Sequence, residues 1–223
     1  EDWLAQFTGA LLEDQKQFGI FCSGGDTTSI KGPLSISITA MGIVTKGKAL
    51  KRSGAKEGDA VILTSPVGDA WVGLQVLQGK IKTADDAYFI GRYYRPQPRF
   101  FSAPHINAAI DISDGLIADL GHICRTSGVG ADLELDKIGF SKQATALLGK
   151  NTINAENLLT GGDDYELVMA VPQAHVSEVL KALGSLGMQP AMIGRFVSGH
   201  PRVRVRGADG ELMELKTTGW THF

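Results

Sequence analysis

Long apolar runs are missing from this sequence of 223 residues, and its formal net charge is only −2. No stretch is long enough to cross a bilayer as a helix, and we predict no membrane partner. The small net charge gives no broad electrostatic basis for binding nucleic acid. No signal peptide is visible, so we expect a cytoplasmic protein.

Cysteine is also scarce, with Cys22 and Cys124 far apart in apolar surroundings. A disulfide framework or a zinc site needs more ligands at closer spacing. We therefore predict two buried, reduced thiols.

The hydrophobic content of 43% is ample for one large domain, or for one and a half. The chain opens on Glu1 in a pattern typical of a helix that ends near Gly19. A short strand at 20–22 and an alternating strand at 34–44 are predicted next. The polar, glycine-punctuated residues 51–59 indicate a domain junction, and we divide the chain into residues 1–56 and 57–223.

Strands and helices alternate after this junction, which predicts an α/β (or α+β) fold with a mixed sheet and packed helices. Residues 149–160 are expected to be a polar loop. The predicted strands are 61–64, 109–112, 132–135, 165–171, 191–196 and 203–205, and the predicted helices are 67–77, 84–94, 100–108, 113–126, 141–148 and 175–186.

Three segments share one design, a short apolar strand followed by a turn of glycine, aspartate and hydroxyl residues. Backbone N–H groups and hydroxyls can hold phosphate oxygens, and glycine lets the backbone approach a ligand. A carboxylate repels phosphate, so aspartate beside such a cradle implies a metal, and oxygen ligands suit Mg²⁺. The segments are 23–28, 111–115 and 161–165.

Each segment also has an ordinary interpretation. Asp114 could be only a helix N-cap, although that leaves Asp111 at the end of an apolar strand unexplained. Asp26 and the pair Asp163 and Asp164 could lie in solvated turns. Three such segments together favour a shared site.

Other candidates are more open. Arg52 and its neighbour Lys51 could clamp phosphate, although exposed solvated cations are more common. Trp220 could stack on an aromatic ligand, but packing on the core as a tail anchor is favoured by the residues alone. His222 is interpreted as structural because no partner is placed to make a catalytic dyad.

Together, five segments resemble the thiamine-monophosphate kinase family, whose superfamily includes aminoimidazole-ribotide synthetase and selenophosphate synthetase. They are residues 24–28, 49–55, 111–116, 161–167 and 219–223. The resemblance implies an aminoimidazole-ribotide synthetase-like C-terminal domain preceded, at 1–56, by the remainder of an ATP-binding and dimerisation domain. It also implies transfer of the γ-phosphoryl group of ATP to thiamine monophosphate.

The resemblance further implies a role for each matching residue. Gly25, Asp26, Arg52 and Ser113 would contact ATP, Asp26, Asp111 and Asp114 would bind Mg²⁺, and Asp163 and Trp220 would line the thiamine site. The family often has glutamate at the position of Asp163. No catalytic base is expected, because the acceptor is an anionic phosphate and metal-assisted transfer is direct.

One departure from the family concerns its N-terminal segment, which carries another metal-binding Gly-Asp-Asp cluster and has no counterpart here. We therefore expect residues 1–223 alone to be nearly inactive, and the full-length protein to be a homodimer. The alternatives are another ATP-using enzyme of the superfamily and a non-catalytic module that binds thiamine phosphates. A structural protein is the least favoured, since it gives no reason for aspartate at three strand ends.

Overall fold

The computed structural model describes residues 2–101 and 105–220, and the chain forms two compact units, Glu1–Val44 and Thr45–Phe223. The first unit contains α1 (Asp2–Phe18), as predicted, and none of its side chains is buried. The rings of Trp3 and Phe7 stack on this helix with their centroids 5.3 Å apart.

The strands predicted at 20–22 and 34–44 are wrong, because residues 20–44 contain neither helix nor strand. An alternating pattern forms a strand only where a second strand supplies hydrogen-bonding partners, and the described residues offer it none. Cys22 is consequently exposed, which corrects its predicted burial. Cys124 is buried as predicted, and burial raises the pKa of its thiol to about 11.

The predicted junction at 51–59 packs within the second unit. The N–H of Ala109 donates to the carbonyl of Lys51 over 3.0 Å, and the N–H groups of Gly54 and Ala55 donate to the Ser127 hydroxyl. Contacts therefore place the division of the chain after Val44, ahead of this segment. The assignment of residues 1–56 to another domain stays a prediction.

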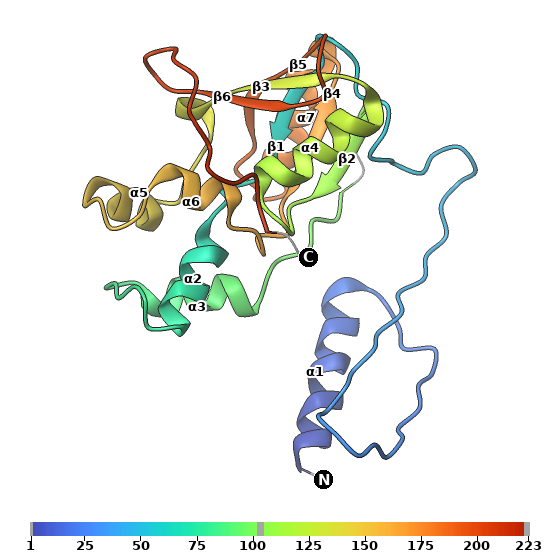
Figure 1. Ribbon diagram of the computed structural model, residues 1–223. Coiled ribbons are helices and arrows are strands. Elements are labelled where there is room, and N and C mark those ends of the chain that lie inside the picture. The colour runs from blue at the N-terminus through green and yellow to red at the C-terminus, as the bar shows by residue number, and fades with distance from the viewer. Residues whose placement is uncertain (1, 102–104, 221–223) are drawn as a thin grey trace. The chain divides into compact units, whose positions relative to one another are not determined.

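A six-stranded sheet forms the centre of the second unit, in the order β2-β4-β1-β5-β3-β6 (Figure 1). All neighbouring strands are antiparallel except β3 and β6, which are parallel. The strands are β1 (Ala60–Leu63), β2 (Ala108–Asp111), β3 (Gly130–Glu134), β4 (Leu167–Val171), β5 (Ala191–Val197) and β6 (Val203–Arg206).

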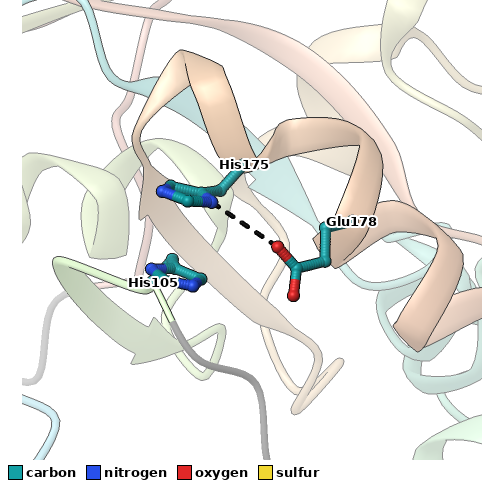
Figure 2. A group of neighbouring side chains, drawn as sticks. All are labelled: His105, His175 and Glu178. Carbon is teal, nitrogen blue, oxygen red and sulfur yellow. Dashed lines mark ion pairs between the residues drawn. The ribbon is translucent and has the colours of Figure 1, made fainter.

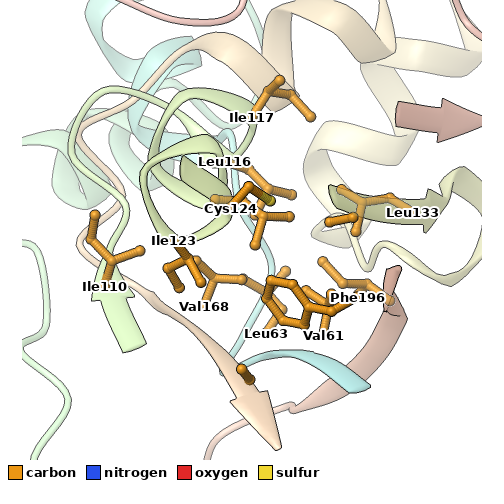
Figure 3. Close-up of a cluster of buried hydrophobic side chains, with 14 of the residues drawn as sticks. Val61, Leu63, Ile110, Leu116, Ile117, Ile123, Cys124, Leu133, Val168 and Phe196 are labelled. Carbon is orange, nitrogen blue, oxygen red and sulfur yellow. The ribbon is translucent and has the colours of Figure 1, made fainter. Parts of the chain in front are cut away.

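Helices bury both faces of this sheet. Val61 and Leu63 of the central strand pack with residues of α4 (Leu116–Ser127) in the core cluster of Figure 3, whereas Ala60 and Ile62 pack with α7 (Val176–Ser185). Because successive side chains of a strand point to opposite faces, these two helices cover opposite sides of the sheet. Burial on both faces explains why β1 is an unbroken apolar run.

A separate helical cluster packs around Phe89 and Leu158. It contains α2 (Asp69–Leu77), α3 (Asp86–Tyr94), α5 (Lys142–Gly149) and α6 (Ala155–Thr160). The hydroxyl of Ser141 caps α5 as predicted, by accepting the N–H of Ala144. Short 3₁₀ turns at Leu135–Lys137 and Gln173–His175 complete the described elements.

Two further predictions are corrected. The polar loop expected at 149–160 contains α6, because Asn154 forms a capping box and Leu158 and Leu159 are buried. The helix expected at 100–108 is wrong. Its described residues form no helix, and Ala108 begins β2 by pairing with Ala170. Its residues 102–104 lie outside the described part.

The mixed α/β prediction is confirmed by the sheet and its packed helices. Within residues 2–101 and 105–220, no helix has the length and apolar character needed to cross a membrane.

Candidate functional site

The acidic turn, residues 111–115, links the end of β2 to the start of α4. Asp111 is the last residue of β2 and pairs with Leu167. The N–H groups of Ser113 and Asp114 both donate to Oδ2 of Asp119, over 3.0 and 2.9 Å. Asp119 lies in the first turn of α4 with only 2% of its surface exposed. Its buried carboxylate therefore holds the backbone of the acidic turn in one conformation.

The adjoining segment, residues 161–166, packs directly against the acidic turn. The N–H of Asp163 donates to the carbonyl of Ser113 over 2.9 Å, and the N–H of Tyr165 donates to that of Ile112 over 2.8 Å. A Cβ on Gly162 would lie 2.4 Å from the Ser113 carbonyl oxygen, so this approach requires glycine. Two turns that are about fifty residues apart in sequence are thus joined by backbone hydrogen bonds.

The carboxylates of these turns influence one another. Burial and then the charge of Asp114 raise the pKa of Asp163. Burial raises the pKa of Asp119 to about 6, and the carboxylates of Asp114 and Asp111 add to this effect. The phenol of Tyr165 has its pKa raised by burial and then by the aspartates of both turns. Such a concentration of negative charge favours a cation.

The charges of Arg52 and Arg125 act on His122, which lies in α4. Thr126 donates its hydroxyl to the Arg52 carbonyl over 2.9 Å, which ties the chain before β1 to α4. Burial, followed by the charges of Arg125 and Arg52, lowers the pKa of His122. The candidate ligand atoms of His122, Asp114 and Asp119 all lie within 4.8 Å of one another.

The C-terminal tail reaches the same turn. The backbone N–H of Trp220 donates to the Asp114 carbonyl over 2.9 Å. A Cβ on Gly219 would lie 2.5 Å from that carbonyl oxygen, so the tail passes very close to it. Trp220 is 65% exposed as a residue, which corrects the interpretation that it packs on the core. His222 lies outside the described residues.

Five of the eight predicted site residues lie in the two joined turns or in the tail beside them, namely Asp111, Ser113, Asp114, Asp163 and Trp220. Arg52 is tied by its carbonyl to Thr126 near the C-terminal end of α4, and its charge acts on His122. Gly25 and Asp26 belong to the first unit, where Oδ1 of Asp26 accepts the N–H of Thr27 over 2.8 Å. Their participation in the same site stays a prediction.

Asp119 and His122 were missed by the sequence prediction. The available signal was polar residues in a helix whose other face is apolar, with Leu116, Leu120 and Ile123 buried. This signal is weak. Asp119 accepts hydrogen bonds from the N–H groups of Ser113 and Asp114, just before its own helix, and such a local contact has no characteristic sequence motif.

A separate group of possible metal ligands, His105, His175 and Glu178, lies beside α7 (Figure 2). Glu178 pairs with His175 over 3.5 Å, and the two histidine rings stack with centroids 3.6 Å apart and an angle of 4° between their planes. The lone pair of an imidazole nitrogen lies in the ring plane, so parallel stacked rings do not direct their nitrogens at one ion. This arrangement does not form a preorganised metal site.

Comparison with known proteins first defines the class. Residues 56–206 match the family model "AIR synthase related protein, C-terminal domain". The crystal structure of thiamine-monophosphate kinase from Stenotrophomonas maltophilia K279a has a TM-score of 0.67 at 34% identity, covering 76% of this chain and 56% of that one. AaThiL complexed with AMPPCP and TMP has a TM-score of 0.62 at 29% identity, covering 78% and 54%.

The sequence comparison is more specific. Thiamine-monophosphate kinase of Escherichia coli (strain K12) is 39% identical over 236 aligned residues, which include all of this chain and 70% of that protein. The chain belongs to the thiamine-monophosphate kinase family. It matches only about half the length of the two solved structures.

Proposed function

We propose that this chain is the part of an ATP-dependent kinase that phosphorylates thiamine monophosphate to thiamine diphosphate. The family membership supports this activity, as does the relative bound to AMPPCP, an ATP analogue, and TMP. The observation that carries the proposal is the joining of the two aspartate turns, because a site for polyphosphate and metal needs carboxylates from distant segments in one place.

The donor set suits Mg²⁺. Asp111 and Asp114 would hold the ion, since both belong to the acidic turn and their charges raise the pKa of Asp119. Carboxylate oxygens are the ligands that Mg²⁺ prefers, and the absence of cysteine from these turns disfavours softer metals. When bound, the ion would offset the repulsion between the phosphates of donor and acceptor. Asp26 of the first unit is a further proposed ligand.

The protein's own groups would position the substrates. Arg52 would contact the nucleotide phosphates through its guanidinium, and Ser113 would donate to a phosphate oxygen. Asp163 and Trp220 would line the thiamine site, since both have their backbones hydrogen-bonded to the acidic turn. The exposed indole supplies a flat apolar surface of the kind on which an aromatic ring stacks.

The proposal is tested by calorimetric titration of the chain with thiamine monophosphate and with ATP, each with and without Mg²⁺. We expect ATP binding that requires Mg²⁺ and is weakened by Asp111→Asn and Asp114→Asn. Binding of ATP that is equal with and without Mg²⁺ would contradict the metal assignment. Lys181→Gln, an exposed position on α7, is the matched control.

The alternatives predict other results. A non-catalytic module would bind thiamine phosphates without metal dependence. Another ATP-using enzyme of the superfamily would release ADP with a different acceptor. Turnover is measured on a chimera that joins this chain to the part of the E. coli relative outside the match, with and without thiamine monophosphate. A homodimer of the whole protein is also proposed, and its mass in solution tests that.

A further inference from the structure

A cavity of about 410 Å³ lies beside the helical cluster, apart from the acidic turn. Its wall includes Arg92 of α3, Arg99, and Lys142 at the start of α5, together with the apolar Pro66 and Phe140. Pockets for small molecules have volumes of about 300–1,000 Å³, so this one has room for a small metabolite.

The two arginines share a single buried counter-charge, Glu166. Arg92 donates to its Oε1 over 3.2 Å, and Arg99 donates to its Oε2 over 2.8 Å and also to Oε1. Thr64 donates to Oε2 over 2.7 Å, so each oxygen of the Glu166 carboxylate accepts two hydrogen bonds. The side chains of Arg92 and Arg99 are only 20% and 17% exposed. Two largely buried guanidiniums thus share one buried carboxylate. Burial raises the pKa values of Asp69 and Asp164, the other carboxyls that act on Arg92, so these groups offset less of its charge.

The other carboxylate of the wall, Asp69, is already engaged. Its Oδ1 accepts the Ser141 hydroxyl over 2.6 Å, and its Oδ2 accepts the Tyr88 hydroxyl over 2.7 Å. Among the described residues, Arg92 makes one side-chain hydrogen bond, although a guanidinium has five N–H donors. Donors in excess of acceptors, on arginine side chains that are mostly buried, favour an incoming anion.

We propose that this cavity binds a small organic anion, a phosphomonoester or carboxylate, whose oxyanion is held by Arg92, Arg99 and Lys142. The apolar part of the ligand packs against Pro66 and Phe140. Glu166 connects the cavity to the proposed active site, because it ends the adjoining segment that contains Asp163. The cavity is therefore a site from which a bound anion can influence that segment.

Isothermal titration calorimetry of the chain with inorganic phosphate and, separately, with acetate at constant ionic strength tests this proposal. We expect saturable binding of at least one of the two, and which one binds identifies the oxyanion. Arg92→Gln and Lys142→Gln are each expected to weaken it about tenfold or more, the loss expected for a charge-assisted hydrogen bond.

Two further variants locate the binding. Lys181→Gln removes an exposed lysine elsewhere and should bind the anion like the unmodified chain. Arg52→Gln removes the guanidinium of the proposed nucleotide site and measures how much of any phosphate binding belongs to that site. If circular dichroism shows that Arg92→Gln unfolds the protein, the proposal is judged from Lys142→Gln, because Lys142 is exposed. The proposal is overturned if neither anion gives saturable heat, if Lys142→Gln binds normally, or if Arg52→Gln abolishes binding.

Discussion

Replacing Gly162 with alanine tests whether the two turns of the proposed active site depend on their close approach. Gly162 has a φ of 81°, and an added Cβ would lie 2.4 Å from the Ser113 carbonyl oxygen. The left-handed conformation costs a non-glycine residue about 1–2 kcal/mol. Relieving the clash separates the turns and weakens the hydrogen bond from Asp163 to Ser113, which adds about 0.5–1.5 kcal/mol. We expect a total loss of about 2–4 kcal/mol, since overpacking strain adds further.

Urea unfolding measures this loss through the fluorescence of Trp71, which is partly buried and faces Gly161. The matched control is Gly91→Ala, because Gly91 lies inside α3 with nothing within 4 Å of an added Cβ. Alanine should stabilise that helix by about 0.5–1 kcal/mol. A Gly162→Ala protein within about 0.5 kcal/mol of the unmodified chain, the usual range for surface changes, would refute the reasoning.

Four more variants probe three buried carboxylates. Asp119→Ala leaves two backbone N–H groups of the acidic turn unsatisfied, at about 1–3 kcal/mol each, whereas Asp119→Asn keeps an acceptor and should cost less in urea unfolding; equal losses would contradict this role. Glu166→Gln leaves two arginines without a counter-charge and should lower the unfolding free energy by about 3–5 kcal/mol; an unchanged midpoint would oppose this. Burial raises the pKa of Asp164 from 3.8 to about 8, so the folded state binds its proton more tightly and loses stability as pH rises between these values. Unfolding at pH 5 and pH 8 should therefore show Asp164→Asn gaining stability relative to the unmodified chain at pH 8, and a constant difference would disprove the shift.

The elements that could be predicted from the sequence are those whose pattern reflects their own burial. β1 is an apolar run because both of its faces are covered, and α4 and α7 each present one apolar side. The alternation at 34–44 is equally regular but forms no strand, since pairing depends on a partner elsewhere. The short α6 was missed because a cap and two adjacent leucines are a small signal within a polar stretch.

The residue types of the proposed site could be predicted from the sequence. The contacts that hold those residues in place were harder to predict. Aspartate in a glycine-rich turn identified both Asp111 and Asp163, although only Asp111 ends a strand, since Asp163 lies between α6 and β4. Backbone hydrogen bonds join the two turns. The contribution of Asp119 depends on where its carboxylate lies relative to two N–H groups, which spacing alone does not give. The exposure of Trp220 likewise depends on the path of the tail, whose backbone rather than its indole is fixed.

The adjoining segment leaves almost no freedom for a change of length. A Cβ on Gly161 would meet Trp71, Asp163 bonds to Ser113, Asp164 accepts the N–H of Gly68, and Glu166 pairs with arginines. One inserted residue would move both buried acids, Asp164 and Glu166, out of reach of their partners. Over evolutionary time we expect this stretch to tolerate exchanges of side chains, accompanied by compensating exchanges in the surrounding helices, while insertions and deletions accumulate in other loops.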